Sequence, residues 1–330
     1  MMHITIEDIA RISGVSKSSV SRYLNNGSVS KKSAEKIKEA IEKTGFETNV
    51  FASRLKSKKS HLIGVLMKGI ESVSVTKTIT GINRYLKQYD YLPFVIYDDV
   101  DEDNDLNKMK ALVAQGVDAI IYGNSHCSNE IRQFISSIKI PVVMIGQKDS
   151  VFPYRKFDDY QAGRILGEYI KSCGIRNIVY LGVNEEDESV GVDRKQGIID
   201  VFKTCSSYEF HYVEADFSFD ASYQKAKECL VYHPDIIIGA SDRMSMGALL
   251  YLHEQKISVP EQISVAGFGG YDFSKVTCPP LTTIAYDYYQ LGKLAAQDVL
   301  KILNEDCYET LDEPEMKLII RESVKTSKSE

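Results

Sequence analysis

The sequence has no tryptophan, and it lacks the features of several classes of protein. No apolar run approaches the roughly 18 residues that a membrane-spanning helix needs, and the N-terminus shows no basic-then-apolar signal pattern. We therefore expect a cytoplasmic protein without a membrane partner. The six cysteines lie far apart with no CxxC pair, which indicates reduced thiols rather than a disulfide framework or a zinc knuckle.

The chain also lacks the motifs of metal centres and of catalysis. Its six histidines show no HxxxH or HExxH spacing, and no serine lies in a GxSxG elbow. The acidic run DDVDEDND at 98–105 lacks the glycine and the final glutamate of a calcium loop. We interpret it as a strand exit that leads into a helix, whose dipole the acids offset. The sequence therefore predicts no metal, no cofactor and no catalytic residue, and a protein that is not an enzyme.

The chain is long enough to bury a large core in two or three domains. Its charge is distributed unevenly along the sequence. The net charge is −6, but residues 1–60 carry 12 Lys and Arg against 6 Asp and Glu, a formal charge of +6. The remaining residues carry 28 against 40, a formal charge of −12. A small basic segment predicts a polyanionic partner, and the acidic body predicts a small neutral or anionic ligand, or no charged ligand.

The basic segment has the spacing of a helix-turn-helix. Thr5 is a suitable N-cap for a first helix that ends before Gly14, a residue able to take a positive φ. Ser16 caps a second helix over about 17–24, and a third helix over about 31–43 closes the bundle. This pattern predicts a small three-helix domain.

The stretch GVSKSSVSRYLNN, with VS and GFETNVFASRLKS after it, resembles the head and hinge of the lactose-repressor/galactose-repressor family of transcriptional regulators. The resemblance implies that Lys17, Ser18 and Arg22 read bases in the major groove, with Arg22 suited to a bidentate contact with guanine. It assigns phosphate contacts to Thr5, Ser16, Ser21 and Asn25. The alternative is a small helical bundle whose basic face is merely solvated.

The segment NVFASRLKS at 49–57 resembles the family's hinge, in which a short helix forms on operator DNA and paired leucines enter the minor groove. The resemblance assigns Leu55 to that wedge, and Asn49 and Arg54 to DNA contact. Because the wedge works only where two hinges meet, it implies a homodimer on a pseudo-palindromic operator. An ordinary core leucine is the alternative for Leu55. No leucine heptad for a tetramer follows LIIRESV, so a dimer is expected.

After His61 short apolar runs alternate with helical patterns. Eight runs are interpreted as buried strands, which predicts parallel sheets in an α/β fold: IGVLM, LPFVIY, DAIIY, PVVMIG, NIVYLGV, FHYVEA, DIIIGA and QISVAGF. The resemblance implies two doubly wound parallel α/β lobes of the periplasmic sugar-binding type, joined by three crossovers. The expected division is 1–47 for the helix-turn-helix domain, 48–60 for the hinge helix and linker, and 61–330 for the effector-binding and dimerisation core. The lobes are placed at about 61–158 with 289–312, and at 159–288 with 313–330.

Ligands of open parallel sheets bind beyond the carboxyl ends of the strands, so the residues after these runs are candidate effector contacts. They form no catalytic set, and they are Lys68, Ser72, Asn124, Gln147, Asp159, Arg194, Phe217, Ser241, Asp242 and Gly269. Arg194, in VGVDRKQG, resembles the family's arginine that makes a fork of hydrogen bonds to sugar hydroxyls, and a surface helix arginine is the alternative. Asp242 resembles an acid that opens the next helix, and a cap without ligand contact is the alternative.

Two departures from the family's pattern bear on the expected ligand. Gly269 and Gly146 stand where the family often has acids that grip sugar hydroxyls. Lys68 stands where a small polar residue is common, and with Arg194 it would suit a sugar phosphate, unless Lys68 is only a rim residue. Because SVSRYLNNGSVS, VGVDRKQG and AGFGGYD resemble the family's sucrose and trehalose operon repressors, sucrose or its 6-phosphate is the expected effector, followed by trehalose or its 6-phosphate.

These features predict a DNA-binding repressor of a sugar-utilisation operon that a sugar or sugar phosphate releases from its operator. A plain sugar-binding protein would need no basic head. A sugar kinase or isomerase would need a phosphate-gripping glycine loop or paired carboxylates, and the sequence has neither. An activator, or a global regulator of the same family that depends on a phosphoprotein partner, stays open as an alternative.

Overall fold

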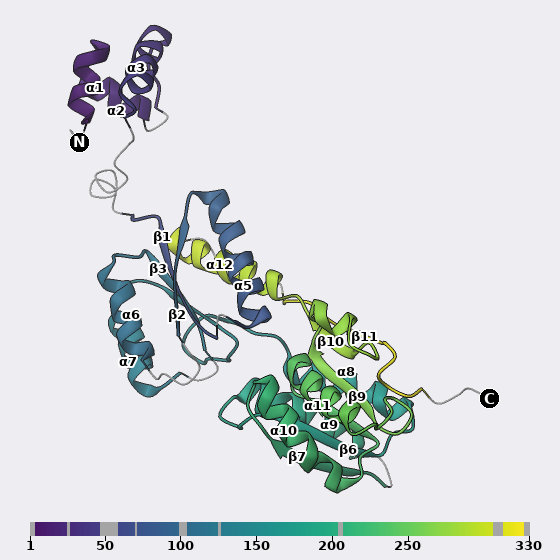
Figure 1. Ribbon diagram of the computed structural model, residues 1–330. Helices are drawn as coiled ribbons and strands as arrows, with labels where there is room; N and C mark the ends of the chain where they lie inside the picture. The colour runs from purple at the N-terminus through teal and green to yellow at the C-terminus, as the bar shows by residue number, and fades with distance from the viewer. Residues whose placement is uncertain are drawn as a thin grey trace. The chain divides into compact units, whose positions relative to one another are not determined.

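The computed structural model describes residues 4–24, 27–46, 59–69, 71–98, 104–124, 127–203, 207–305 and 313–326. The chain divides into two compact units, Met1–Ser60 and His61–Glu330, which are described separately (Figure 1). Within the described ranges, no helix has both the length and the apolar character that crossing a bilayer requires.

The first unit is a bundle of three short helices, α1 (Ile6–Ser13), α2 (Lys17–Leu24) and α3 (Lys31–Thr44). The three helices expected from the sequence are therefore present. Thr5 and Asp8 cap α1 reciprocally in a capping box, which satisfies two otherwise unpaired N–H groups. Gly14 ends α1 in the left-handed conformation at φ +65°, a geometry that costs little only for glycine.

The bundle has a small hydrophobic core of its own. One apolar face of each helix supplies it, and its buried members are Ile9, Val20, Ile37, Ala40 and Phe46. Leu24 is partly buried against this core, as its helical spacing from Val20 predicts. The head therefore forms its core without any side chain from the second unit.

The second unit contains two sheets, and the first is a five-stranded parallel sheet in the order β2-β1-β3-β4-β5. Its strands are β1 (Leu62–Lys68), β2 (Leu92–Asp98), β3 (Ala119–Gly123), β4 (Val142–Ile145) and β5 (Tyr154–Arg155). Helices α5 (Val73–Leu86) and α12 (Tyr288–Leu303) pack together on one face, and α6 (Asp105–Ala114) and α7 (Asn129–Ser137) lie on the other. We call this sheet with its helices the first lobe.

The second lobe is built on a six-stranded sheet in the order β11-β10-β9-β8-β6-β7. Its strands are β6 (Asn177–Gly182), β7 (Glu209–Glu214), β8 (Ile236–Gly239), β9 (Ser264–Gly269), β10 (Thr282–Tyr286) and β11 (Met316–Ile319). The helices are α8 (Asp159–Ser172), α9 (Arg194–Phe202), α10 (Phe219–Cys229) and α11 (Asp242–Glu254). Helices α8 and α9 pack as one pair, and α10 and α11 as another.

Short helical segments complete the second unit. They are the 3₁₀ segments η1 (Lys87–Tyr89), η3 (Leu230–Tyr232) and η4 (Asp272–Lys275), and the π-helical segment η2 (Glu188–Asp193). The π-helical segment directly precedes α9, and such segments are frequent at functional sites.

All eight strands expected from apolar runs are present, but three further strands were not predicted. β5 has only two residues. β10 begins with threonines and β11 contains a lysine, so neither has a continuous apolar run along its length. β11 pairs antiparallel with β10 at one edge, while the other described strand pairs are parallel, as predicted. An antiparallel edge strand is a common addition to a parallel sheet.

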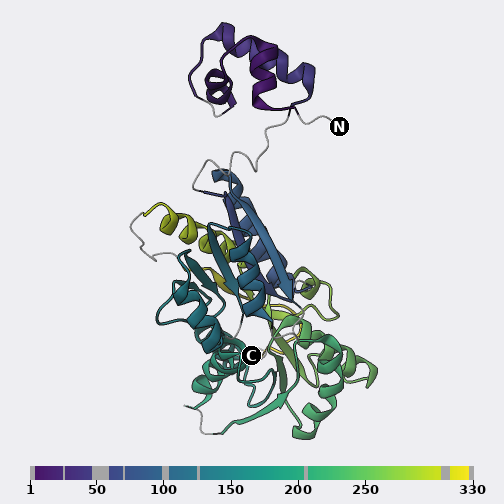
Figure 2. The same cartoon turned by 90° about the vertical axis from the view of Figure 1, so that its left-hand side faces the viewer.

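The chain passes between the lobes three times. It crosses after β5, again between β10 and α12, and a third time between α12 and β11. Helix α12 therefore lies against α5 although more than 200 residues separate them, and both views show this yellow-green helix beside the blue elements of the first lobe (Figures 1 and 2).

A buried ion pair fastens this last helix to the end of the first sheet. Arg155 on β5 donates from Nη2 to Asp298 Oδ1 on α12 at 2.8 Å, and its Nε donates to Oδ2 of the same carboxylate. The Asp298 side chain is fully buried and that of Arg155 is 7% exposed. The pair therefore joins β5, which precedes the first crossing between the lobes, to α12, which follows the second crossing.

We expect Asp298→Ala to lower the free energy of unfolding by about 3–5 kcal/mol, because it leaves the buried Arg155 guanidinium without its carboxylate. Urea unfolding followed by circular dichroism measures this change. The exposed Glu130 of α7, replaced by alanine, is the matched control and should change the stability by less than about 0.5 kcal/mol. Equal losses in the two variants would contradict the structural role of the pair.

Candidate functional site

The second helix of the head carries the polar face that the sequence predicts. Ser16, Lys17, Ser18 and Arg22 are exposed, whereas Ser21 is partly buried. Ser16 Oγ accepts the Ser19 N–H at 3.2 Å, so this side chain caps α2. Lys17 pairs with Glu7 of α1, and both side chains remain more than half exposed. The face therefore presents hydroxyl and cationic groups around one fully buried anchor, Val20.

Several predicted DNA contacts have other roles in the structure or lie outside it. The Thr5 hydroxyl donates to the Asp8 carboxylate at 2.7 Å and accepts the Asp8 N–H at 3.3 Å, so both of its hydrogen-bonding functions are used in the cap. Asn25, Asn49, Arg54 and Leu55 lie outside the described residues, so their predicted roles stay predictions.

The second lobe places Arg194 at the centre of a buried polar cluster. Arg194 is the first residue of α9, and its Nε donates to Asp159 Oδ1 at 2.6 Å. Nη1 donates to the backbone oxygen of Ala240, just after β8, at 2.7 Å. Tyr286 donates its hydroxyl to the same Asp159 oxygen at 3.0 Å. Arg194 is 7% exposed, so the alternative of a surface helix arginine is wrong.

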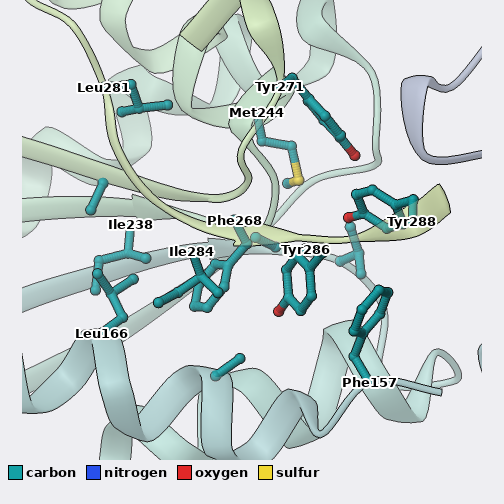
Figure 3. Close-up of a cluster of buried hydrophobic side chains, with 14 of the residues drawn as sticks. Phe157, Leu166, Ile238, Met244, Phe268, Tyr271, Leu281, Ile284, Tyr286 and Tyr288 are labelled. Atoms are coloured by element: carbon teal, nitrogen blue, oxygen red, sulfur yellow. The ribbon is translucent and has the colours of Figure 1, made fainter. Parts of the chain in front are cut away.

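Aromatic rings surround this guanidinium. Its central carbon lies 5.2 Å from the centre of the Phe268 ring and 5.0 Å from that of Tyr286. Figure 3 shows Phe157, Tyr286 and Tyr288 side by side, and the ring centres of Phe157 and Tyr286 are 4.6 Å apart. Flat apolar faces next to a fork of N–H donors are the combination that binds a sugar ring and its hydroxyls. We call Arg194, Asp159 and these rings the Arg194 site.

Electrostatic interactions keep Arg194 charged and paired with Asp159. Burial alone would lower the pKa of Arg194, yet the adjacent Asp159 carboxylate raises it well above its ordinary value. Burial also raises the pKa of the Tyr286 hydroxyl far above its ordinary value. The arginine therefore stays protonated, and the tyrosine stays a neutral hydrogen-bond donor.

Asp242 bonds to neighbouring segments of the second lobe. Ser241 is the N-cap of α11, and its Oγ accepts the Met244 N–H at 3.3 Å. Asp242, the first residue of α11, is fully buried and accepts the Thr283 hydroxyl at 2.5 Å and the Tyr271 N–H at 3.1 Å. Burial raises the pKa of this carboxyl, although those hydrogen bonds oppose the change. Asp242 thus joins α11 to the segments around β9 and β10.

The first lobe brings three predicted residues to one edge of its sheet. Met67 pairs with Gly123, and Gly123 with Ile145, so Lys68, Asn124 and Gly146 follow at the same level on neighbouring strands. Asn124 donates from Nδ2 to Asp105 Oδ2 at 2.5 Å. Gln147, one residue further on, is 7% exposed, and its Nε2 has no hydrogen-bond partner among the described residues.

Direct contacts join this edge to the second lobe. The Ser189 hydroxyl, in the π-helical segment, donates to the backbone oxygen of Gly146 at 3.0 Å. Lys156, in the first crossing segment, pairs with Asp193 of the same π-helical segment at 2.9 Å. The carboxyl edge of the first sheet therefore faces the segment that leads into Arg194.

Three of the predicted effector contacts have no described side-chain contact with the Arg194 site. Ser72 precedes α5 and has its Oγ 2.7 Å from that of Ser74. Phe217 lies before α10 and is 40% exposed. Gly269 ends β9 at φ +144°, and a Cβ there would lie 2.9 Å from the Tyr271 ring, so a larger residue would be strained at this position.

A separate hollow of about 430 Å³ lies at the far end of α11, away from the residues that the sequence predicts. It is lined by Leu249, His253, Lys256, Ile257, Ser258, Val259, Glu261, Cys278 and Pro279. In the part of the chain that the structure describes, no group of three or more His, Cys, Asp or Glu side chains is arranged to hold a metal ion.

The sequence alone missed several members of the site. Tyr286 ends β10, whose strand character had no apolar run to reveal it. Asp105 ends the acidic run that we interpreted as a strand exit leading into a helix, and it is the first residue of α6, as that interpretation expects. Its burial, at 1% exposure, and its bonds to Tyr122 and Asn124 were not predicted. A signal for Asp105 was available in the sequence, because the polar residue Asn124 follows β3. The helix after β2 starts at the same edge of the sheet, so its first residue could be expected to meet Asn124.

Replacing Asp242 by asparagine should change how stability depends on pH. A raised folded pKa means that the folded core binds a proton more readily than the unfolded chain. This stabilisation is present below the ordinary value of 3.8 and is lost as the pH rises through the folded value. The unfolding free energy of the wild type minus that of Asp242→Asn should therefore fall as the pH rises above about 4.

Urea unfolding at a series of pH values measures this difference, and the exposed Asp220, replaced by asparagine, serves as control. A difference that does not vary with pH would contradict the raised pKa of the buried carboxyl.

Comparison with known proteins places both units. Residues 60–322 match the family described as periplasmic binding proteins and sugar binding domain of LacI family, and residues 5–49 match bacterial regulatory proteins of the lacI family. The sucrose operon repressor of Staphylococcus xylosus is 31% identical over 311 residues, which cover 92% of this chain and 95% of that protein. Catabolite control protein A of Priestia megaterium is 25% identical over 92% of this chain and 94% of that protein.

Among solved structures, the lac repressor dimer bound to operator and an anti-inducer has the same fold, with a TM-score of 0.89 over 98% of this chain and 99% of that chain. Its sequence is 22% identical. The curated relatives are transcriptional regulators and not enzymes. The matches span both the helix-turn-helix and the two lobes, and this chain therefore belongs to the LacI family of bacterial regulatory proteins.

Proposed function

We propose that this protein represses the transcription of a sugar-utilisation operon by binding operator DNA, and that a sugar or a sugar phosphate releases it. The observation that carries the proposal is the combination, in one chain, of the exposed Lys17, Ser18 and Arg22 on α2 with the buried Arg194 site. The first is suited to base edges in a major groove, and the second to sugar hydroxyls. Such a repressor works in the cytoplasm.

The proposed organisation is a helix-turn-helix domain over 1–47, a hinge over 48–60 and an effector-binding core over 61–330. The chain acts as a homodimer, because a two-fold arrangement places two heads on the halves of a pseudo-palindromic operator. The lac repressor with the same fold is a dimer on its operator, which supports this organisation. Leu55 at the hinge is the proposed wedge in the minor groove.

Sucrose or its 6-phosphate is the first proposed effector, and trehalose or its 6-phosphate the second. The support is the 31% identity to a sucrose operon repressor, together with the aromatic rings and the Arg194 fork. A second candidate function is global catabolite control, which the similarity to catabolite control protein A favours. The two candidate functions differ in the signal that controls DNA binding, because global catabolite control needs a protein partner in addition to a small molecule.

The proposed mechanism is a shift between two arrangements of the lobes. An effector at the Arg194 site favours the arrangement in which the two heads no longer fit the operator. A difference of about 3 kcal/mol between the arrangements lowers operator affinity by roughly a hundredfold, which is enough for induction. The Ser189–Gly146 bond and the Lys156–Asp193 pair are the described polar contacts that such a shift would change.

Arg22→Ala should weaken binding to the operator by about 1–3 kcal/mol, because it removes a bidentate contact with guanine. Fluorescence anisotropy with DNA from upstream of the protein's own gene measures the affinity, with unrelated DNA of equal length for comparison. The matched control is Lys38→Ala on α3, where the side chain is 68% exposed and pairs with Glu42. An equal loss on both DNAs would contradict base reading by Arg22, and wild-type protein without preference for its upstream DNA would contradict the proposed function.

Arg194→Ala should leave operator binding intact and abolish release by the effector. Because this change strands the buried Asp159 carboxylate, the double variant Arg194→Met with Asp159→Leu removes both charges and protects the fold. Anisotropy is measured as sucrose, trehalose and their 6-phosphates are added in turn. The exposed Arg176, replaced by alanine, is the control and should respond like the wild type. Release of the Arg194 variants by the wild-type effector would show that the effector binds elsewhere.

A further inference from the structure

The chain enters the first lobe through a residue whose backbone is in the left-handed conformation. The boundary between the two compact units lies between Ser60 and His61, and β1 begins at Leu62. His61 has φ +56°, in a region that histidine and asparagine tolerate better than most residues and that β-branched residues almost never adopt. The residue that joins the head unit to the first sheet therefore makes a sharp turn.

Both backbone groups of His61 are bonded to the strands on either side of β1. Its N–H donates to Asp118 Oδ2, just before β3, at 2.8 Å. Its carbonyl oxygen accepts the Leu92 N–H, at the start of β2, at 3.0 Å. Because β1 lies between β2 and β3 in the sheet, these two bonds hold His61 from opposite sides. The backbone of His61 cannot rotate without breaking one of them.

The side chain of His61 packs on the same lobe. Its ring centre lies 4.9 Å from that of Tyr91, a residue that is 6% exposed. The Nδ1 atom of His61 is buried and has no hydrogen-bond partner among the described residues, so packing on Tyr91 rather than bonding of Nδ1 holds the ring on this side. His61 therefore moves as part of the first lobe.

A second left-handed residue of the same lobe gives a comparison. Asp90 has φ +59° and follows η1, so it connects two elements inside the lobe. The chain before His61 leads instead to the head unit. A residue other than glycine keeps such a conformation only where its surroundings impose it. At His61 the bonds from β2 and β3 impose a direction on the segment that continues toward the head.

Building on the proposed function, we propose that the left-handed turn at His61 sets the direction in which the chain leaves the first lobe toward the head, and that this residue passes a rotation of that lobe to the head. Two heads on one operator must meet two half-sites at a fixed spacing. A fixed direction at each start removes conformations that would otherwise be lost on binding. A single head on half an operator has no spacing to match. His61 is thus a positioning residue that acts without contacting DNA.

The test is fluorescence anisotropy of the full chain with two DNAs. One is DNA from upstream of the protein's own gene, and the other is the same DNA cut at the centre of the protected footprint, which leaves half an operator. His61→Val places a β-branched residue at a positive φ and so forces the chain out of this turn. We expect affinity for the whole operator to fall by about tenfold or more, and affinity for the half operator to change by less than about threefold.

Two substitutions at neighbouring chemistry separate the turn from the ring. His61→Gly removes the ring but adopts the positive φ freely, so it should keep whole-operator affinity within about threefold of the wild type. A loss as large as that of the valine variant would overturn the proposal. Asp118→Ala removes the acceptor of the His61 N–H and should lower whole-operator affinity by about threefold or more, whereas Asp118→Asn keeps an acceptor oxygen and should not. The Asp118 variants decide the proposal if His61→Val fails to fold.

The matched control is Asp90→Val, which creates the same backbone strain in the same lobe away from the path to the head. Urea unfolding should show a loss of stability like that of His61→Val, while the preference for the whole operator stays that of the wild type. An equal loss of preference in Asp90→Val would show that His61 has a merely structural role.

The two levels of the argument fail in different ways. A wild-type preference for the whole operator that survives His61→Val would overturn this inference alone. Wild-type protein that binds the whole and the half operator equally would contradict the proposed homodimer on a pseudo-palindromic operator, and this inference with it.

Discussion

The buried pair of Arg194 and Asp159 is the interaction on which the arrangement of the second lobe depends. Arg194 opens α9 and Asp159 opens α8, so the pair joins two helix starts on one side of the sheet. The Ala240 carbonyl after β8 and the Tyr286 hydroxyl at the end of β10 complete the bonding. A buried charge that loses its partner costs several kcal/mol, so the pair links these four segments. The same bonds fix the orientation of the guanidinium.

The two units are stabilised separately, which suits a protein with two kinds of partner. The head has its own caps and its own core around Ile9, Val20 and Ile37. The lobes share a much larger core and exchange only a few described polar contacts, among them the Ser189–Gly146 bond. These polar contacts and the shared apolar core together set the balance that the proposed effector would have to shift.

Most of the fold could be predicted from the sequence because its signals are local. Thr5, Gly14 and Ser16 mark helix boundaries through groups that are close in the chain, and the eight apolar runs identify strands that are buried on both faces. The strands that were missed had no such signal, since β5 is short and β11 pairs antiparallel at an exposed edge. Their pairing is fixed by neighbours distant in sequence.

The sequence by itself determined the helix-turn-helix and the α/β class, because spacing and apolar patterns are properties of neighbouring residues. Arg194 was singled out by its resemblance to the family's arginine. Only the tertiary structure decided the partners of each charge. It paired Arg194 with Asp159, turned Asp242 toward Thr283, and buried Asp105 of an acidic run against Asn124. The physical reason is that a buried charge must be matched by groups that meet it in space, and those groups come from segments far apart along the chain.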